Sequence, residues 1–321
     1  MRPAVLAVDA GQTGIRAALT EEERGPPRGS PTRTATAPGV LRMSGGVGPE
    51  EVGAGLLAAV AGLGRLPEAP LLMGVGLSGL EAAAEEDLQH VEELLRTELA
   101  VEALAIASDG LTSLLGALGE RDGAVVAAGT GTVCVARRGA RLVKVDGWGS
   151  LLGDAGSGYA IGRAGLDAAL RHADGRGGSR ALLRAAERRY GPAPGLSERI
   201  YSAPVPTRAI AAFAADVAVE ARASDGEACA ILADAGRELA LTGTAALARL
   251  FASDEPAALS YTGNVFRAGA PLVEPFARSL GERRPATELV PPAGDSLAGA
   301  VRLAALGAHL QPEPGILWKA R

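Results

Sequence analysis

The stretch AVVAAGTGTVCVAR, residues 124–137, breaks an apolar run with Gly-Thr-Gly-Thr and then resumes it. This pattern predicts a strand, a tight turn and a second strand. The turn is either an ordinary β-hairpin, with glycine at positive φ, or a loop whose main-chain amides and threonine hydroxyls bind an anion. The turn alone leaves both interpretations open, because short glycine motifs are weak signals.

The same plan occurs near the start of the chain. LAVDAGQTGIRAAL, residues 6–19, also places a Gly/Thr turn between two apolar strands, and it carries Asp9 where the later stretch has Ala128. A carboxylate beside a polyphosphate is repelled unless a Mg²⁺ ion lies between them. One turn with an acid and one without therefore predict a metal–triphosphate held from two sides, and the pair favours this interpretation over two unrelated hairpins.

Composition sets the class of protein. The 321 residues are 47% hydrophobic, which is ample for two domain-sized cores. A net charge of −5 predicts neither nucleic acid nor an anionic membrane as partner. The sequence has no run of about 18 apolar residues, so it predicts no membrane span. Its first residues lack a signal-peptide pattern. Two cysteines far apart in the sequence form no disulfide framework, which predicts a reducing, cytoplasmic location.

The order of expected elements predicts an α/β fold. Antiparallel strands come first, then strands that alternate with helices, and the second half repeats the strand–turn–strand plan before a largely helical region. We expect strands within 3–20, 31–39, 71–79, 102–109, 122–139 and 257–269, and helices over 48–63, 85–99, 110–119, 159–172, 207–223, 226–250 and 294–310.

Asp109 is the strongest candidate for catalysis. It follows a buried strand and precedes a helix, and ligands of α/β folds bind at the carboxyl ends of strands. Phosphoryl transfer needs positioning, charge neutralisation and an acceptor for the hydroxyl proton. The alternative is that Asp109 caps the helix that begins at Gly110.

Three further residues have two interpretations each. Asp154, in LLGDAGSG, either forms an Asx turn or accepts hydrogen bonds from sugar hydroxyls. Trp148 either packs on a sugar face or belongs to a core. Cys134 alternates with valines, which is typical of a small core residue.

The motifs VDAGQTG, ASDG, AAGTGT, GWGSLLGDAGSGYAIGR and TGNVFRAG occur in the order seen in the BadF/BadG/BcrA/BcrD ATPase family. Within it the sequence most resembles N-acetylglucosamine and glucosamine kinases, which belong to the actin-like superfamily. The resemblance implies two ribonuclease-H-like α/β domains, residues 1–110 plus 295–321 and residues 111–294, with nucleotide and substrate in the cleft between them. It also implies ATP and Mg²⁺ as cofactors and phosphorylation of an amino sugar at its 6-hydroxyl.

The resemblance assigns roles to residues that match the motifs. Asp109 is the general base and Asp9 holds magnesium. The nucleotide-binding residues are Gly11, Gln12, Thr13, Gly129, Thr130, Gly131, Thr132, Gly263 and Asn264. The substrate-binding residues are Ser78, Gly79, Asp109, Gly147, Trp148, Gly149 and Asp154.

Three departures leave the sugar open. Ala155 stands where the family often has Glu, Arg42 lies where many amino-sugar kinases have Asn, and Gln12 replaces a Gly. The expected partner is a small-molecule sugar, and a homodimer is left open.

Two other functions remain. Activator ATPases of the wider family hold an iron–sulfur cluster between subunits by cysteine thiolates, an arrangement that Cys134 and Cys229 do not match. A nucleotide-binding regulator without turnover is disfavoured by the presence of both Asp9 and Asp109.

Overall fold

The computed structural model describes residues 3–11, 14–20, 33–39, 47–80, 83–306, 311–312 and 316–319 of the chain. It confirms an α/β fold with two six-stranded sheets. The chain divides into two compact units, each described by itself below. Unit 1 comprises Met1–Val125, Val135–Lys144 and Pro291–Arg321, and unit 2 comprises Val126–Cys134 and Val145–Val290. The expected domain boundaries stay a prediction.

The first sheet lies in unit 1 and has the order β12-β5-β4-β1-β2-β3. Strands β1, β4 and β5 run parallel to one another, whereas β2, β3 and β12 pair antiparallel with their neighbours. At one edge, the amide of Ser108 also donates to the carbonyl of Ile316 (2.8 Å), beside β12. The bounds are β1 (Ala4–Ala10), β2 (Ile15–Thr20), β3 (Arg33–Ala37), β4 (Leu71–Leu77), β5 (Val101–Ser108) and β12 (Leu317–Lys319).

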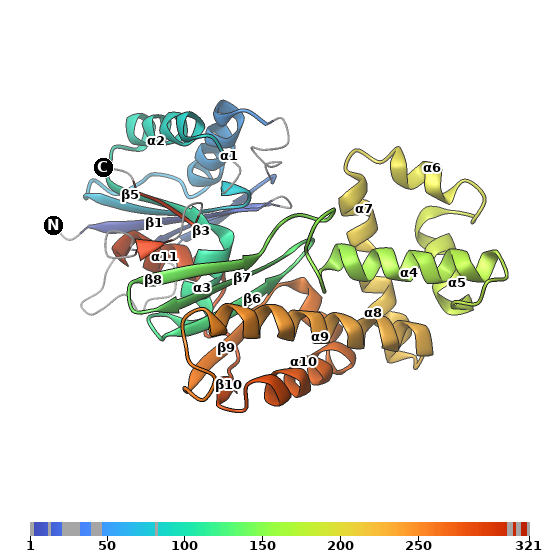
Figure 1. Ribbon diagram of the computed structural model, residues 1–321. Coiled ribbons are helices and arrows are strands. Elements are labelled where there is room, and N and C mark those ends of the chain that lie inside the picture. Colours follow the sequence, from blue (N-terminus) through green and yellow to red (C-terminus); the bar gives the residue numbers. More distant parts are fainter. Residues whose placement is uncertain are drawn as a thin grey trace. The chain divides into compact units, whose positions relative to one another are not determined.

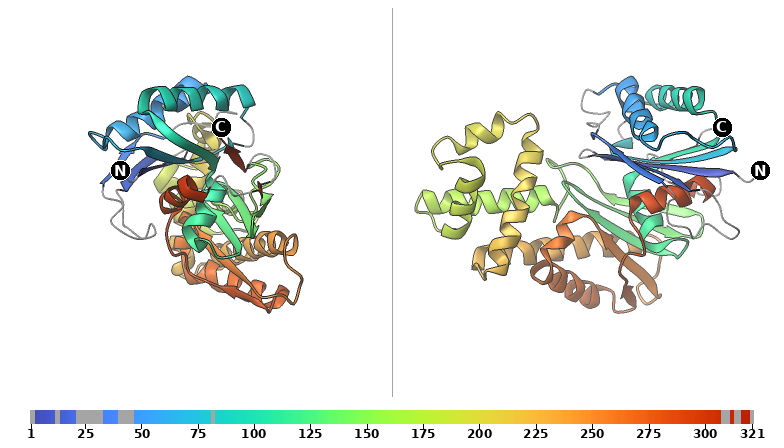
Figure 2. Two further views of the ribbon diagram at one scale, coloured as in Figure 1. Left: turned by 90° about the vertical axis from the view of Figure 1, so that its left-hand side faces the viewer. Right: turned by 180° about the vertical axis from the view of Figure 1, so that it is seen from behind.

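Helices cover both faces of this sheet (Figures 1 and 2). On one face, α1 (Pro49–Ala61) and α2 (Glu85–Leu99) pack on alternate residues of β1 such as Leu6 and Val8. On the other face lie α3 (Asp109–Leu118) and α11 (Ser296–Leu306), where the small side chain of Ala7 packs with α11. Because strand side chains alternate between faces, Asp9 lies on the face that α11 covers.

The second sheet has the order β10-β9-β6-β7-β8-β11. Its strands are β6 (Gly123–Ala128), β7 (Thr132–Arg138), β8 (Arg141–Asp146), β9 (Ala257–Thr262), β10 (Thr287–Leu289) and β11 (Gln311–Pro312). The helices of unit 2 are α4 (Gly158–Ala173), α5 (Arg180–Tyr190), α6 (Leu196–Tyr201), α7 (Pro206–Ala212), α8 (Ala214–Arg222), α9 (Gly226–Ala248), the 3₁₀ helix η3 (Asn264–Ala268) and α10 (Ala270–Arg283).

Most expected elements are present, with one correction. The helix expected over 207–223 is two helices, α7 and α8, which meet at Phe213. The ring of Phe213 is fully buried and lies 6.1 Å from that of Tyr190. The strands β8, β10, β11 and β12 and the helices α5, α6 and α10 have no counterpart among the expected elements. Within the described ranges, no helix has the length and apolarity that crossing a bilayer requires.

Candidate active site

The carboxyl ends of three parallel strands carry the candidate residues of unit 1. In register, Ala10 at the end of β1 pairs with Leu77 of β4, and Leu77 pairs with Ser108 of β5. Just beyond β4, the amide of Ser78 donates to the carbonyl of Ala10 (3.1 Å), which holds the ends of β1 and β4 side by side. Asp9, Ser78 and Asp109 therefore lie at one edge of the sheet, the edge at which α/β folds bind ligands.

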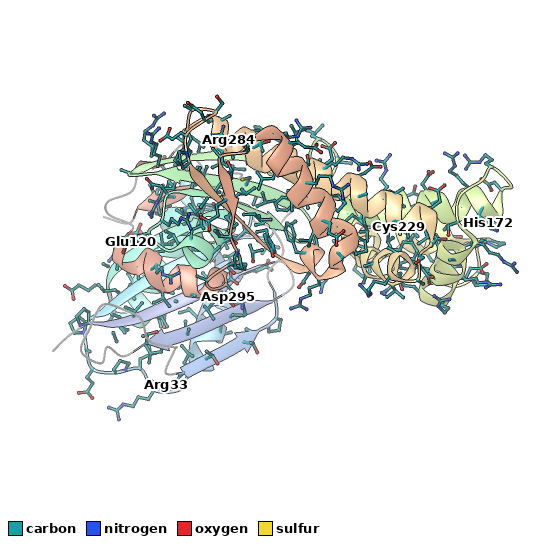
Figure 3. All side chains as sticks on the ribbon, turned by 90° about the horizontal axis from the view of Figure 1, so that it is seen from below. Arg33, Glu120, His172, Cys229, Arg284 and Asp295 are labelled. Atoms are coloured by element: carbon teal, nitrogen blue, oxygen red, sulfur yellow. The ribbon has the colours of Figure 1, made fainter. Side chains whose placement is uncertain are left out.

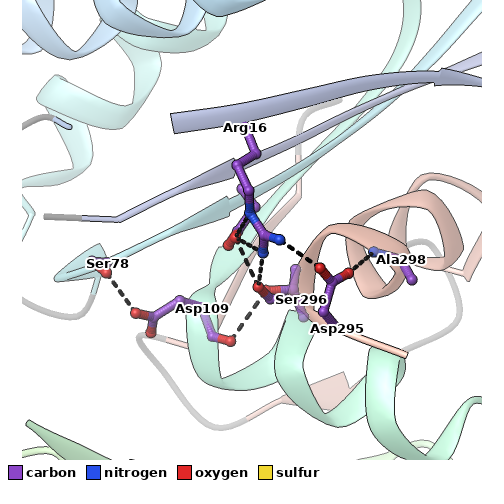
Figure 4. Close-up of polar contacts among 8 residues, drawn as sticks. Arg16, Ser78, Asp109, Asp295, Ser296 and Ala298 are labelled. Atoms are coloured by element: carbon purple, nitrogen blue, oxygen red, sulfur yellow. Dashed lines mark hydrogen bonds and ion pairs between the residues drawn. The ribbon is translucent and has the colours of Figure 1, made fainter. Parts of the chain in front are cut away.

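Asp109 is the first residue of α3, but it is not the cap. The helix is capped by Ser108, whose Oγ accepts a hydrogen bond from the amide of Leu111 (3.3 Å). The Oδ2 atom of Asp109 instead accepts a hydrogen bond from the Ser78 hydroxyl at 2.5 Å (Figure 4). The cap interpretation of Asp109 is wrong, because the preceding serine satisfies the helix amide and the carboxylate is directed toward the end of β4.

The Asp9 carboxylate has charged and polar partners that the sequence motifs did not include. Arg16, directly opposite Asp9 in the β1–β2 register, donates from Nη2 to Asp9 Oδ2 at 2.6 Å. The Ser296 hydroxyl donates to the same oxygen at 2.8 Å, and Arg16 also pairs with Asp295. An Asp and an Arg at positions that pair in the β1–β2 hairpin are a sequence signal for the contact between Asp9 and Arg16, and this hairpin pattern gives no signal for Asp295 or Ser296.

The first turn is described only in part. The amide of Gly11 donates to the carbonyl of Gly14 at 3.0 Å, which closes the turn between β1 and β2. Gln12 and Thr13, both expected to bind nucleotide, and Arg42 lie outside the described residues.

The second turn, residues 129–132, has its carbonyls bound and two amides unbound. The carbonyls of Gly129 and Thr130 accept from the first amides of α4, those of Gly158 (2.8 Å) and Tyr159 (3.1 Å). No described residue accepts from the main-chain amides of Thr130 and Gly131. Adjacent unpaired amides in a glycine turn are the donors of an anion-binding nest, so the geometry suits a phosphate group.

Asp154 supports this turn from beneath. Its side chain is buried, and Oδ1 accepts from the amide of Thr132 at 3.2 Å. A Cβ atom on Gly131 would lie 2.6 Å from Asp154 Oδ2, so only glycine leaves room for the carboxylate. The Asp154 side chain thus reaches across to another loop. Its expected role in sugar binding remains a prediction.

The loop between β8 and Asp154 is fixed at its base and exposed at its tip. Asp146 Oδ1 accepts from the amides of Gly147 and Asp154, both at 2.9 Å. At the tip, Trp148 is 75% exposed, and Leu151 and Leu152 are also exposed. The core interpretation of Trp148 is therefore wrong within this unit. Asp146, which closes the loop, was not among the expected site residues, although an Asp before Gly is a common turn signal.

Gly263 lies close to the second turn, at the end of β6 that precedes it. Its φ is +103°, and a Cβ there would collide with the backbone of Ala128, the last residue of β6. Asn264 follows it, exposed at the start of η3. The structure thus brings the motifs at 129–132, 154–158 and 263–264 together within unit 2.

The cysteines have structural surroundings. Cys134 is completely buried on β7, and burial, together with the nearby charge of Asp146, raises the pKa of its thiol. Cys229 lies on α9 (Figure 3), and its thiol contacts the carbonyl of Ala221 at 3.4 Å. Among the described residues, no three His, Cys, Asp or Glu side chains cluster as metal ligands.

Comparison with known proteins identifies the family. Residues 51–304 match the model of the BadF/BadG/BcrA/BcrD ATPase family. The chain belongs to that family. A curated relative, the N-acetylmuramic acid/N-acetylglucosamine kinase of Clostridium acetobutylicum, is 27% identical over 245 residues, which cover 75% of this chain and 79% of the relative.

Solved structures agree with the family assignment. A Chromobacterium violaceum protein assigned as an N-acetylglucosamine kinase is 28% identical, with a TM-score of 0.71 and coverage of 94% of this chain and 99% of that one. A glucokinase of the ROK family from Streptomyces griseus, solved with glucose and AMPPNP, shares the fold at 19% identity, with a TM-score of 0.61 and coverage of 94% and 98%.

The range that matches the BadF/BadG/BcrA/BcrD model contains Asp109 and Asp154 and both motifs of unit 2 that surround the second turn. Asp9 and the first turn precede the matched range. The roles expected for Asp9 and the first turn rest on the resemblance of VDAGQTG and on the chain's own repeat of strand, turn and strand, and they stay predictions.

Proposed function

We propose that this protein transfers the γ-phosphoryl group of ATP to the 6-hydroxyl of an amino sugar, N-acetylglucosamine or glucosamine, with Asp109 as general base. The observation that carries the proposal is the position of Asp109 at the end of β5, with its carboxylate held by Ser78 while Ser108 caps the helix. A carboxylate at a ligand-binding edge can accept the proton of an attacking hydroxyl group.

The hydrogen bond from Ser78 gives Asp109 one fixed orientation. A general base must lie within hydrogen-bond reach of the proton that it accepts, and small displacements lower the rate steeply. The serine is itself anchored, because its amide donates to the carbonyl of Ala10 at 3.1 Å. We propose that Ser78 and Gly79 contribute to the sugar side of the site and that Asp109 takes the proton of the attacking hydroxyl.

The second turn supports the nucleotide role. Its two unpaired amides, of Thr130 and Gly131, are neutral donors suited to phosphate oxygens. The same turn is rigid, because its carbonyls are bound by α4 and because Asp154 holds Thr132. We propose that these residues bind the phosphates and that Gly263 and Asn264 bind the nucleoside side of ATP.

Asp9 is the proposed residue for the magnesium ion that accompanies ATP. A hard carboxylate oxygen suits Mg²⁺, which usually keeps several waters and binds through one or two carboxylates and the substrate phosphates. The described residues contain no larger acidic cluster, so this donor set fits a nucleotide-borne ion better than a cage formed by protein alone. When bound, the ion neutralises charge that develops on the phosphates.

We propose that the loop at 147–154 binds the sugar. Gly147 and Gly149 both have positive φ, which bends the main chain sharply on either side of Trp148. The exposed indole offers an apolar face, and sugar rings pack well on aromatic faces because their C–H groups are apolar. The names of the relatives suggest amino sugars as the class, and Ala155 and Arg42 leave the individual sugar to experiment.

The cysteines disfavour the activator-ATPase alternative. Cluster ligation needs thiolates, whereas burial raises the pKa of Cys134 and Cys229 lies on a separate helix. No described pair of cysteines forms a cluster-binding set.

A panel of sugars in an ADP-release assay tests the proposal. We expect ADP release to require both Mg²⁺ and sugar, with N-acetylglucosamine, glucosamine and N-acetylmuramic acid in the panel and glucose as comparison. Phosphorus–proton coupling in the NMR spectrum of the product identifies the phosphorylated hydroxyl. ADP release at the full rate without any sugar would contradict the kinase, and a product phosphorylated elsewhere would contradict the 6-hydroxyl.

A further inference from the structure

A small charged cluster ties the first strand pair of unit 1 to the start of α11. Asp9 on β1 and Arg16 on β2 are cross-strand partners, and both lie on the sheet face that α11 covers. Asp295 and Ser296 stand at the beginning of that helix, and Figure 4 shows the Arg16 guanidinium directed at both. Residues from the two ends of the chain thus converge on one carboxylate.

The hydrogen bonds within this cluster leave the two oxygens of Asp9 unequal. Arg16 donates to Oδ2 from Nη2 (2.6 Å) and from Nε (3.2 Å), and Ser296 donates to the same atom (2.8 Å). Among the described residues, the hydrogen bonds to this carboxylate all end on Oδ2. Asp9 is therefore held by one oxygen, and its plane is fixed by donors from two elements.

Arg16 is fixed in turn by a second carboxylate. Its Nη1 atom donates to Asp295 Oδ2 at 2.5 Å, while Asp295 Oδ1 accepts from the amide of Ala298 at 3.0 Å. The Ser296 hydroxyl also accepts from Arg16 Nη2 at 3.0 Å. With one cation between two carboxylates, the cluster keeps a net formal charge of −1, which favours a divalent cation bound with an anionic nucleotide.

Arg16 and Asp295 stabilise each other's charged forms. Burial by itself lowers the pKa of Arg16, but its hydrogen bonds and charge contacts with the two carboxylates raise it above its ordinary value. Burial by itself raises the pKa of Asp295, but the amide of Ala298 and the guanidinium of Arg16 lower it overall. Both groups therefore remain ionised.

We propose that Arg16 and Ser296 are positioning residues of the metal–nucleotide site, which hold Asp9 by Oδ2 so that Oδ1 serves the water shell of the Mg²⁺ ion. Asp295 fixes Arg16 and restores the negative charge that the arginine would cancel. The inference rests on the proposed function in one respect, namely that Asp9 serves the metal ion of ATP.

Orientation is the main consequence of these contacts. The side chain of Arg16 is 40% exposed, and ion pairs at that exposure contribute little to folding stability. Outer partners that orient a metal-binding side chain typically change metal affinity by about 10- to 100-fold when they are removed. Two guanidinium donors and the Ser296 hydroxyl on one oxygen also restrain the carboxylate more than a single donor does.

The test compares metal-dependent nucleotide binding in full-length Arg16→Gln and Ser296→Ala with wild type. Calorimetry measures AMPPNP affinity with Mg²⁺ and with EDTA, and electron paramagnetic resonance measures Mn²⁺ binding in the presence of AMPPNP. We expect Arg16→Gln to weaken Mn²⁺ binding by about 10- to 100-fold, and Ser296→Ala to weaken it by a smaller factor. Metal-free AMPPNP affinity should change little in either variant.

Arg96→Gln is the matched control. Arg96 forms a partly buried pair with Glu92 on α2, at 2.9 Å, in the same unit. The substitution Arg96→Gln removes one guanidinium from an ion pair that is about as exposed as the pair of Arg16 and Asp9. We expect this control variant to leave Mn²⁺ binding unchanged. If Arg16→Gln does not fold, Arg16→Lys and Ser296→Ala provide the test.

The sign of the effect separates orientation from charge. Removing a cation beside Asp9 strengthens Mn²⁺ binding if only Coulomb attraction matters, and weakens it if orientation matters. Tighter binding in Arg16→Gln, or values equal to those of Arg96→Gln, overturns the inference while the proposed function stands. If the AMPPNP affinity of the wild type is the same with and without Mg²⁺, both the inference and the proposed function are wrong. If Arg16→Gln weakens Mn²⁺ binding as expected but no sugar stimulates ADP release, the inference is supported and the proposed kinase activity is contradicted.

Discussion

Asp109→Asn distinguishes a base from a structural residue, because the structure assigns the cap to its neighbour. Asparagine keeps the size of the side chain and can still accept from the Ser78 hydroxyl, but it cannot take a proton. General-base catalysis contributes about 10²- to 10⁴-fold, which corresponds to about 2.7–5.4 kcal/mol of transition-state stabilisation. We expect kcat to fall by that factor while the affinity for nucleotide and the melting temperature stay close to wild type.

Ser108→Ala is the matched variant one residue earlier. It removes the Oγ that accepts from Leu111, and loss of such a cap costs about 1 kcal/mol, or about 2–4 °C in Tm for a domain of this size. We expect Ser108→Ala to lower Tm with kcat nearly unchanged, the reverse of Asp109→Asn. The assays are steady-state ADP release with saturating sugar and a thermal melt of each variant. If Asp109→Asn keeps the wild-type kcat, Asp109 is not the base.

Three further outcomes are expected. Gly129→Ala should weaken AMPPNP binding at unchanged Tm, since a Cβ there meets no protein atom. Gly131→Ala should also lower the free energy of unfolding by about 1–3 kcal/mol in chemical denaturation, because its Cβ displaces Asp154 from Thr132. Equal unfolding free energies of the two variants contradict this. Trp148→Ala should raise KM for the sugar with little change in KM for ATP, and an unchanged sugar KM argues against stacking. The lowered pKa of Asp295 means that its stabilising effect is present above its ordinary pKa and is lost as the pH falls through the lower folded value. Asp295→Asn should therefore flatten the decline in unfolding free energy below about pH 5, and parallel curves for variant and wild type contradict this.

Local patterns in the sequence were sufficient for the two hairpins and for the parallel strands of the first sheet. The Gly/Thr turns between apolar runs predicted the hairpins, because periodicity and turn chemistry act over a few residues. Local patterns could not decide whether Ser108 or Asp109 is the N-cap of α3, because both residue types cap helices well. The hydrogen bond from the amide of Leu111 to Ser108 Oγ decides between them.

Contacts between distant segments were beyond the sequence. Arg16 and Asp295 are 279 positions apart, and their pairing depends on how α11 packs on the sheet. Likewise, the exposure of Trp148 depends on the Asp146 contacts that close the base of its loop. The link from Asp154 to Thr132 spans 22 positions and two loops, and a local turn signal gives no indication of it.

The edge strand β12 has a consequence for how the chain matures during synthesis. The second turn and the segments that support it lie between residues 126 and 290, so all of unit 2 is synthesised before residues 291–321. Unit 1 must wait for residues 291–321, which supply the hydroxyl and carboxylate around Asp9 and the strand that pairs with β5. A chain released before residue 291 therefore contains the second turn but lacks Asp295 and Ser296 near Asp9, and it leaves the edge at β5 open. Open strand edges are surfaces on which chains aggregate, so the contacts around Asp9 and the cover of this edge depend on the same late-synthesised segment.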